Sequence, residues 1–598
     1  MAETIDLDIP KPKIKARKLC VETYAKAQSL NLDPILARIL ASRVSEAHQN
    51  LEKLLLPRLS YLANPFSMKD MAKAADRVAL AILEGECIGI ETDHDCDGQT
   101  SHAVIYDILT RHFKHPPEKI RSYIGHRLKE GYGLSESVAN RILADVPVCS
   151  LLITADNGSA DEPRIARLKA AGIEVIVTDH HAIPTEGPPK SAYACLNPSE
   201  PNCSYADPFI AGCMVAWLLM AATRQKLIEL QYLPETAPSL ADTLDFVAVG
   251  TVADCVSMAK SVNNRAVVSY GLQLIDKGAR PCWRALKELI PGKVRSEDLG
   301  FRIGPLLNSD GRIATAFGSV TFLLTETDEE AEKWIGALQL QNETRKGLQQ
   351  QVFLEALVLA KREVTLGKVA ICLYLKEGHT GVQGIVASRL TEMFGRPTLI
   401  FAPKVATEGD SLITGSARGI AAFHVREAMQ TVADNHPGLI KMFGGHKGAG
   451  GLTLALSNFE AFKIAFEAAT ALQLAGEPYL GPVIWTDGEL DVQALNLDFF
   501  DNLAHLEPFG REFEPPLFEL NAIAREMRPV GDGRHLRLKL EIDKQHFTGI
   551  WFNARALNEN AFPISLNKKL KLACSLKENL FRGKRTLDIH IVSAQECV

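Results

Sequence analysis

The stretch that decides the fold is CIGIETDHDCDG, residues 87–98, in which a short apolar run ends in three aspartates and a glycine. Similar apolar runs follow at residues 148–155 and 173–178, and segments with helical patterning separate them. Short apolar strands that alternate with helices are typical of βαβ units around a buried parallel sheet. We therefore predict an open α/β domain over residues 67–327.

The rest of the chain divides by composition. Residues 1–66 carry a basic stretch and helical patterning, which predicts an N-terminal helical segment. Residues 328–363 contain no proline and are rich in Glu, Gln and Leu, so we expect one long connecting helix over 328–366. A second α/β domain is predicted over 367–479, with a glycine-rich loop at 444–451. Short alternating runs in residues 480–598 predict a small β-barrel or sandwich.

Overall composition is that of a globular, multidomain protein. Of 598 residues, 46% are hydrophobic and 23% are charged, which excludes a largely disordered or collagen-like chain. The net charge of -6 argues against a nucleic-acid binder held by bulk positive charge. However, residues 521–598 contain 14 Lys or Arg against 8 Asp or Glu, so positive charge is concentrated in the C-terminal segment.

Cysteine usage and hydropathy bear on the cellular compartment. The 12 cysteines are scattered and none are spaced as CxxC, which excludes a zinc ribbon and indicates a reducing, cytoplasmic compartment. The N-terminus has no apolar core of a secretory signal. The longest apolar run, residues 213–222, is shorter than the ~20 residues that a membrane span needs, so no membrane association is expected.

Acidic and histidine residues follow four apolar runs, and we interpret each of these runs as a strand. In open parallel sheets, ligands bind at the carboxyl ends of strands. Carboxylates that converge there repel one another unless divalent cations neutralise them, and mixed Asp and His ligands suit Mn²⁺ or Mg²⁺. If residues 93–97 are extended, alternate aspartates share one face. Candidate metal ligands therefore lie among the aspartates of 93–97, at Asp156, in the Asp-His-His at 179–181 and at Asp254.

Each motif has a simpler interpretation. Asp156 or Asp254 alone fits a helix cap. The Asp-His-His at 179–181 fits a solvated loop. The alternating aspartates resemble a calcium loop, although the spacing and the distal glutamate of an EF-hand are missing. The metal site is the better hypothesis because four such motifs occur in one chain, each after an apolar run.

In this order the motifs resemble those of the DHH phosphoesterase superfamily. Further motifs narrow the resemblance to the RecJ family of single-strand-specific 5′ to 3′ exonucleases, over about residues 67–598. These are His-Arg at 126–127, Glu-Gly-Tyr-Gly at 130–133, Asn-Pro at 197–198, Gly-Pro-Leu-Leu-Asn at 304–308, Gly-Arg at 311–312, the run 379–389, Gly-Ser-Ala-Arg at 415–418, Gly-Gly-His at 444–446, and the segment 507–518. The resemblance implies a DHH domain, a DHHA1 domain and a C-terminal OB-like barrel.

The resemblance also implies the chemistry: two ions, Mn²⁺ or Mg²⁺, hydrolyse phosphodiester bonds in DNA recombination and repair. Asp95 would bind one ion and Asp97 the other, Asp156 would bridge them, and Asp93 would support the first site. His180 with Asp254 would complete the second. The catalytic residues would be Asp97, Asp156 and His181, with His181 either facing the phosphate or only supporting the site.

A further set of residues is expected to bind nucleic acid or phosphate, because arginines form bidentate bonds with phosphate and glycines allow close backbone approach. Any one arginine also fits a surface ion pair, and glycine-rich loops often serve only as turns. The set comprises Arg127, Asn157, Asn308, Arg312, His379, Ser388, Arg389, Ser416, Arg418, Gly444, Gly445 and His446.

The expected substrate is single-stranded DNA, and the chain is expected to be a monomer. The resemblance implies a single-stranded-DNA-binding protein, a RecQ-type helicase and mismatch-repair factors as partners. The alternatives are an oligoribonuclease or cyclic-dinucleotide phosphodiesterase, a non-catalytic single-strand-binding scaffold, and a metal hydrolase unrelated to nucleic acids. The β-rich C-terminal segment favours the exonuclease, because such a barrel binds single strands by stacking and charge.

Overall fold

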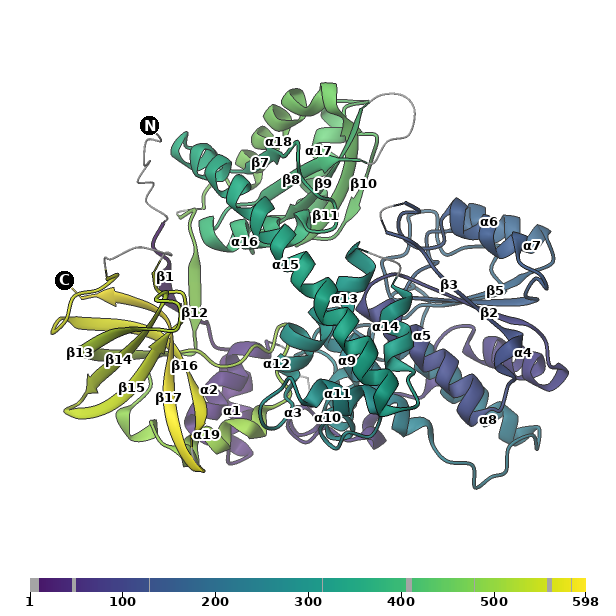
Figure 1. The fold of residues 1–598 in the computed structure, drawn as a ribbon, viewed down its shortest axis with the longest axis horizontal. Helices are drawn as coiled ribbons and strands as arrows, with labels where there is room; N and C mark the ends of the chain where they lie inside the picture. Colours follow the sequence, from purple (N-terminus) through teal and green to yellow (C-terminus); the bar gives the residue numbers. More distant parts are fainter. Residues whose placement is uncertain are drawn as a thin grey trace. The chain divides into compact units, whose positions relative to one another are not determined.

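The computed structural model describes residues 10–45, 50–127, 129–313, 316–404, 411–477, 479–555, 562–581 and 583–597. The chain forms two compact units, and Figure 1 labels their helices and strands. The parallel-sheet unit comprises Asn50–Leu348 and Pro508–Glu514; the barrel unit comprises Met1–Gln49, Gln349–Glu507 and Pro515–Val598. The predicted N-terminal segment, residues 1–66, is therefore divided between the two.

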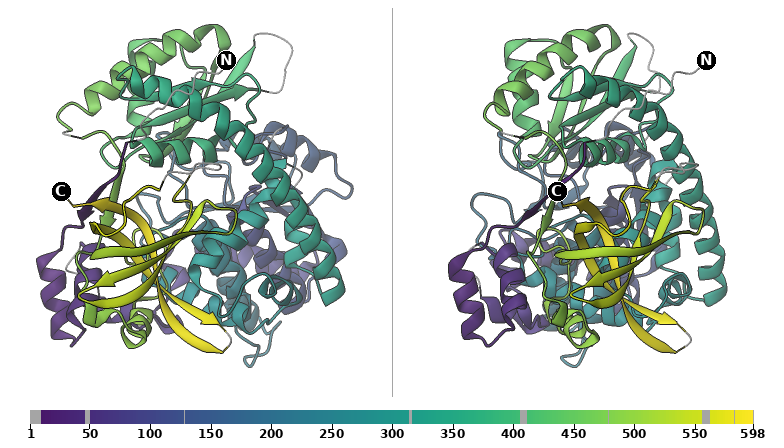
Figure 2. Two further views of the ribbon diagram at one scale, coloured as in Figure 1. Left: turned by 60° about the vertical axis from the view of Figure 1, so that its left-hand side comes forward. Right: turned by 90° about the vertical axis from the view of Figure 1, so that its left-hand side faces the viewer.

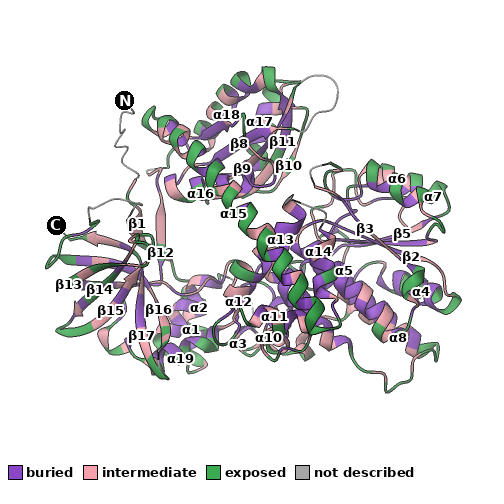
Figure 3. Cartoon of the chain, in the orientation of Figure 1, coloured by how far each residue is buried: buried purple, intermediate pink, exposed green. Residues whose placement is uncertain are grey.

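A five-stranded sheet forms the centre of the parallel-sheet unit, in the order β3-β2-β4-β5-β6, with every neighbouring pair parallel. Its strands are β2 (Ile88–Thr92), β3 (Ile120–Ile124), β4 (Leu151–Ala155), β5 (Glu174–Thr178) and β6 (Ala194–Leu196). Every residue of β2 and β4 is buried (Figure 3). Burial on both faces explains why these strands are continuous apolar runs rather than alternating ones, and it confirms the predicted parallel sheet.

Helices cover both faces of this sheet. On one face, α6 (Glu136–Ala144) and α7 (Glu162–Ala170) bury Val138, Ile142, Ile165 and Leu168 against Leu152 and its neighbours. The other face contacts α4 (Met71–Glu84), α5 (Cys96–Asp107) and α8 (Gly212–Glu229). The remaining helices of the unit are α3 (Leu51–Leu55), α9 (Leu244–Ala253), α10 (Val262–Asp276), α11 (Pro281–Lys287), α12 (Ser296–Asp298), α13 (Gly304–Ile313) and α14 (Phe317–Leu323).

Two local predictions in this unit are wrong. The apolar run before Asp254 is the helix α9, not a strand; it packs against α5, α8 and α10, and an apolar run that is buried on all sides carries no periodicity. Residues 93–97 are not extended throughout either, because Asp95 caps α5 and accepts hydrogen bonds from the amides of Asp97 (3.0 Å) and Gly98 (3.2 Å). A Cβ at Gly98 would lie 2.2 Å from the Asp93 carbonyl oxygen, so this turn requires glycine.

The predicted connecting helix is confirmed as α15 (Asp328–Thr365), which begins in the parallel-sheet unit and ends in the barrel unit. Asp328, Glu329 and Glu330 occupy its first turn, where acidic side chains offset the positive end of the helix dipole. Gly336 and Gly347 do not interrupt it.

The barrel unit contains a mixed sheet in the order β10-β11-β9-β8-β7. Strand β7 is parallel to β8, and the other pairs are antiparallel. The predicted glycine-rich loop is in fact the hairpin of β10 and β11. The elements are β7 (Ile371–Tyr374), α16 (Gln383–Phe394), β8 (Thr398–Pro403), β9 (Leu412–Arg418), α17 (Val425–Asn435), β10 (Met442–Gly445), β11 (Ala449–Ala455) and α18 (Phe459–Gln473).

The C-terminal strands, drawn in yellow-green and yellow in Figure 2, close into the predicted barrel. Their order around it is β13-β14-β15-β17-β16. They are β13 (Phe518–Val530), β14 (His535–Ile542), β15 (Gln545–Trp551), β16 (Lys569–Phe581) and β17 (Lys584–Glu596), and α19 (Leu497–Leu503) contacts β16 and β17. Alternate residues of β14 are buried, as expected where a strand has one face on a core.

The N-terminal segment is not entirely helical. Alongside α1 (Val21–Ser29) and α2 (Pro34–Arg43), the strand β1 (Lys13–Ala16) pairs in parallel with β12 (Val483–Thr486). A buried ion pair supports this arrangement, since Arg43 Nη2 lies 2.9 Å from Asp487 Oδ2. Among the helices that the structure describes, none combines the length and apolar character needed to cross a bilayer.

Candidate metal centre and phosphate-binding residues

The six predicted metal ligands and His181 lie together in the parallel-sheet unit, at the ends of β2, β4 and β5 and of α9. They form three overlapping groups whose ligand atoms lie within 4.8 Å of one another. The groups are Asp93 with Asp95 and Asp156; Asp97 with His180 and Asp254; and Asp156 with His180 and His181. Because Asp156 and His180 belong to two groups each, the groups form one continuous cluster.

His180 lies at the centre of the cluster. Its Nε2 is 3.2 Å from Asp156 Oδ1, 3.5 Å from Asp254 Oδ2 and 3.8 Å from Asp97 Oδ2. Within the described ranges, no hydrogen bond reaches the buried Oδ1 of Asp156. Asp156 also has a φ of +64°, an unusual conformation for a residue other than glycine. A buried, unsatisfied oxygen among carboxylates and imidazoles is a suitable ligand for a divalent cation.

Electrostatics lead to the same conclusion. Burial, followed by repulsion from Asp97 and Asp95, raises the pKa of Asp156 and of Asp254 well above the ordinary value. The pKa of Asp95 is raised by burial and by Asp93 and Asp97. These carboxylates therefore repel one another as anions, and a bound cation would remove that repulsion.

Asp97 is held by the first amides of α8. The amide of Gly212 donates to its Oδ2 at 2.7 Å and that of Cys213 to its Oδ1 at 2.9 Å, and a helix N-terminus stabilises a carboxylate. A Cβ at Gly212 would lie 2.7 Å from the Cβ of Asp156, so α8 approaches the cluster closely only because this residue is glycine. No local pattern in the sequence marks Gly212 or Cys213 as part of the site.

His181 lies between two side chains that the sequence analysis did not select as site residues. Its Nδ1 is 2.8 Å from Asp179 Oδ1, and its Nε2 is 3.1 Å from the Tyr132 hydroxyl. Burial would lower the pKa of His181, but Asp179 outweighs burial and raises it to about 9. The pKa of Asp179 is lowered despite burial, chiefly by the hydrogen bond to His181. The motifs Asp-His-His and Glu-Gly-Tyr-Gly were the only sequence signals for this pair.

Four predicted phosphate-binding residues belong to this unit. Arg127 is half-buried, and with His94 it lowers the pKa of Asp93 against the effect of burial. Asn308 Oδ1 accepts the amide of Cys96 at 3.0 Å and so supports the turn that carries Asp95 and Asp97. Asn157 is 1% exposed, so its side chain is buried next to Asp156 in sequence. Arg312 is half-buried near the end of α13.

In the barrel unit, three of the predicted residues converge beside Gly384. Arg418 Nε donates to Ser388 Oγ at 3.1 Å, and Gln383 Nε2 donates to Ser416 Oγ at 3.4 Å. A Cβ at Gly384 would lie 2.8 Å from Arg418 Nη2 and 3.5 Å from Ser416 Oγ. The absence of a side chain at Gly384 thus lets an arginine and two hydroxyls group around the buried backbone of this residue.

The other predicted residues of the barrel unit are placed differently. Arg389 lies over the ring of Phe353, 3.8 Å from its centroid, and donates to Gln350 at 3.4 Å, so it contacts α15 instead of Arg418. His379 Nδ1 accepts the amide of Gly381 at 3.0 Å, in the turn before α16. Gly444, Gly445 and His446 lie at the tip of the β10–β11 hairpin.

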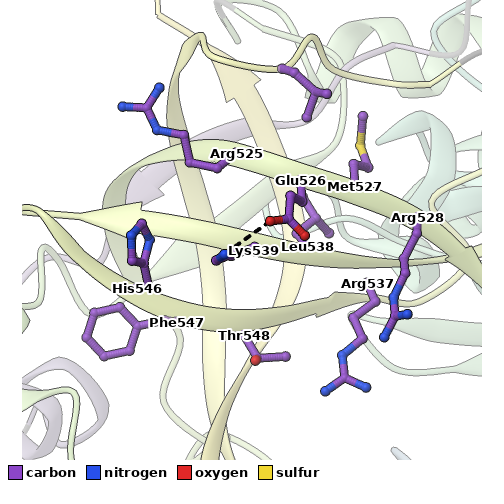
Figure 4. A pocket seen from close by; sticks show the side chains of 11 residues that line it. Arg525, Glu526, Met527, Arg528, Arg537, Leu538, Lys539, His546, Phe547 and Thr548 are labelled. Carbon is purple, nitrogen blue, oxygen red and sulfur yellow. Dashed lines mark hydrogen bonds and ion pairs between the residues drawn. The ribbon is translucent and has the colours of Figure 1, made fainter.

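A basic groove crosses strands β13, β14 and β15 of the barrel (Figure 4). Arg525 and Lys539 are neutralised by Glu541 (2.9 Å) and Glu526 (3.1 Å). Arg528 and Arg537 have no ion pair in the part of the chain that the structure describes. The lining residues are Arg525, Glu526, Met527, Arg528, Arg537, Leu538, Lys539, His546, Phe547, Thr548 and Leu566.

Comparisons with known proteins agree with these observations. Three family models match: the DHH family N-terminal domain over residues 87–251, the DHHA1 domain over 367–471 and the RecJ OB domain over 486–593. The single-stranded-DNA-specific exonuclease RecJ of Dickeya dadantii is 34% identical, and the alignment covers 94% of this chain and 96% of that protein. RecJ of Haemophilus influenzae is also 34% identical, over 97% of this chain and 98% of that protein. The crystal structure of RecJ from Thermus thermophilus in complex with Mn²⁺ superposes with a TM-score of 0.77 at 27% identity, over 98% of this chain and 80% of that one. The chain therefore belongs to the RecJ family of single-stranded-DNA-specific exonucleases.

Proposed function

We propose that this protein degrades single-stranded DNA from its 5′ end by hydrolysing phosphodiester bonds with two divalent cations, Mn²⁺ or Mg²⁺, in DNA recombination and repair. The observation that carries the proposal is the cluster of five aspartates and two histidines in three overlapping groups, in a chain of the RecJ family. The Thermus thermophilus relative has been crystallised with Mn²⁺ and with Mg²⁺.

The three groups support an assignment of ligands. Asp93, Asp95 and Asp156 would hold one ion, and Asp97, His180 and Asp254 the other. Asp156 would be common to both, since its Oδ1 lies 3.2 Å from His180. When bound, the ions would polarise the scissile phosphate and activate a water molecule for attack.

The chain's own residues would do the rest of the chemistry. With Nδ1 of His181 fixed by Asp179, its Nε2 would donate a proton to a phosphate or leaving-group oxygen, and the Tyr132 hydroxyl would orient the ring. Arg418, Ser388 and Ser416 are the residues that we assign to a terminal 5′-phosphate. The basic groove of the barrel would bind the following nucleotides by charge and by stacking on Phe547.

The match to the RecJ OB domain supports a polymeric substrate over an oligoribonucleotide or cyclic dinucleotide. The intact carboxylate cluster supports an enzyme over a non-catalytic scaffold. A single-stranded-DNA-binding protein, a RecQ-type helicase and mismatch-repair factors are partners that the family resemblance implies. The cytoplasmic location rests on the scattered cysteines. These calls and the monomeric state remain predictions.

Digestion of end-labelled oligonucleotides tests the proposal. With Mn²⁺ present, a 5′-phosphorylated single strand that carries a 5′ label should release labelled mononucleotides from the first time points, whereas a 3′ label should stay in shortening strands. Duplex of the same sequence should persist, and a chelator should stop the reaction. Early release of the 3′ label would contradict the polarity, and digestion in chelator would contradict the metal mechanism.

A further inference from the structure

A short segment from the C-terminal half of the chain is built into the parallel-sheet unit. This segment, Pro508–Glu514, lies between α19 and β13 in sequence, and we call it the 508–514 strap. Arg265 of α10, which is 0% exposed, donates from Nη1 to the carbonyl of Pro508 at 3.0 Å and lies 4.5 Å from the ring centroid of Phe513. Phe509 stacks on Phe513 at 6.1 Å. The strap is therefore anchored by buried contacts and is not a loose linker.

The middle of the strap holds the loop that follows Asp254. The amide of Met258 donates to the carbonyl of Arg511 at 2.9 Å. Ser257 Oγ donates to Glu512 Oε2 at 2.6 Å, and Lys260 Nζ lies 3.2 Å from the same carboxylate. A hydroxyl, an ammonium and a backbone amide of one loop therefore all bind to two adjacent strap residues.

This loop begins immediately after Asp254, whose own amide still donates to the Gly250 carbonyl of α9 at 2.9 Å. Asp254 directly follows α9, and the next residue, Cys255, turns the chain at a φ of +58°. A left-handed conformation at a residue other than glycine is unfavourable by itself, so surrounding contacts must maintain it. On the side of α10, Asn264 Nδ2 donates to the Ser257 carbonyl at 3.0 Å; the strap supplies the contacts described above.

We propose that the 508–514 strap completes the metal centre by positioning Asp254, with Glu512 as the positioning residue. The inference rests on the proposed function, in which Asp254, Asp97 and His180 hold the same ion. Glu512 touches neither ion nor substrate and acts through the loop. A truncation that removes residues 508–598, the strap together with the barrel, would therefore damage the metal centre as well as DNA capture.

The test is Mn²⁺ binding to the full-length protein, followed by the electron paramagnetic resonance signal of free Mn²⁺. Wild type should bind two ions. Glu512→Ala should weaken one of them by about tenfold or more, the usual effect of losing a group that orients a ligand. Glu512→Gln keeps an acceptor for Ser257 and should retain most of the affinity. The matched control is Glu343→Gln, which removes a carboxylate from an exposed ion pair with Lys346 on α15.

A double-mutant cycle separates positioning from general damage. Asp254→Asn should weaken the same site without removing it, and Glu512→Ala should then cause little further loss there, because both changes act on the same ligand. Ser257→Ala removes the same hydrogen bond from the other side and serves if Glu512→Ala folds poorly. Unchanged binding in Glu512→Ala and Ser257→Ala, or equal losses with and without Asp254, would overturn the role of the strap alone. Wild-type protein that binds no Mn²⁺ would overturn the proposed function, and the strap proposal with it.

Discussion

The metal centre and the basic groove of the barrel handle charge in opposite ways. In the metal centre, like charges are buried together, and the pKa values of Asp95, Asp156 and Asp254 rise as a result. In the groove, cations lie on exposed strands, where Arg525 and Lys539 are neutralised by acids and Arg528 and Arg537 face solvent.

The difference indicates how each region responds to change. Buried carboxylates that repel one another stay in place only if the structure around them is rigid. Here that structure consists of the sheet, the first turn of α8 and the turn at Gly98, so small displacements have large effects. Exposed cations act additively and are screened by salt. Substitutions in the metal centre should therefore abolish activity, whereas those in the groove should weaken binding in graded steps.

The largest effect is expected for Asp156→Ala. It removes the residue common to two of the ligand groups and should lower Mn²⁺-dependent cleavage by roughly 10³-fold, the scale for losing a group that acts directly on the transition state. Initial rates on a 5′-phosphorylated single strand measure this.

The metal-free melting temperature of the same variant provides the control. Relief of the charge repulsion on Asp156 and the strain of alanine at a φ of +64° oppose each other, so Asp156→Ala should melt within about 4 °C of wild type in chelator. Full cleavage by the variant would contradict the assignment of Asp156, and a much lower melting temperature would show that the residue supports the fold instead.

A second, smaller effect is expected for Gly212→Ala. The added methyl would meet Asp156 Cβ at 2.7 Å and Asp156 Cα at 2.8 Å, and would displace the amides that hold Asp97. We expect Mn²⁺ affinity to fall by about 10- to 100-fold, as measured by titration. The matched control is Gly336→Ala on α15, where an added Cβ meets nothing within 4 Å. Equal affinities for the two variants would show that the surround of the metal centre is not rigid.

Sequence order predicted the candidate ligands that the structure brings together, because Asp93 to Asp97, Asp156 and His180 lie within a few residues of the ends of buried strands in one parallel sheet. What it missed are contacts between distant segments. The amide of Gly212 reaches Asp97 across 115 residues, and Glu512 reaches Ser257 across 255. Neither residue has a local pattern that distinguishes it. Asp254 was predicted as a ligand even though the apolar run before it, α9, was wrongly predicted as a strand. The prediction still placed Asp254 beside the other candidates, because a helix end and a strand end can present a carboxylate at the same edge of a sheet.

In the groove, Arg537→Ala should have a graded effect. Loss of one phosphate contact should lower affinity for a long single strand several-fold and reduce the slope of log K against log salt by about 0.7. Hydrolysis of very short oligonucleotides should change little. Binding isotherms at several salt concentrations test this, with Arg585→Ala as control, since Arg585 is already paired with Asp501 at 2.8 Å. An unchanged slope for Arg537→Ala would place the strand elsewhere on the barrel.

The smallest effect concerns His102 of α5, where burial acts on a cation. Burial lowers its pKa to about 4, while Nε2 lies 2.9 Å from Ser122 Oγ. An unfolded histidine titrates near 6.5, so the folded state binds fewer protons between pH 6.5 and 4. Stability is therefore complete above pH 6.5 and falls as the pH drops through that window. Between pH 7 and 5.5 the loss of stability from this group is about 1 kcal/mol.

Urea unfolding of metal-free wild type and of His102→Gln at both pH values tests this. On going from pH 7 to 5.5, the unfolding free energy of wild type should fall by about 1 kcal/mol more than that of the variant. A constant difference would mean that His102 is hydrated in the folded protein, and that the interior beside the metal centre is more polar than its burial indicates.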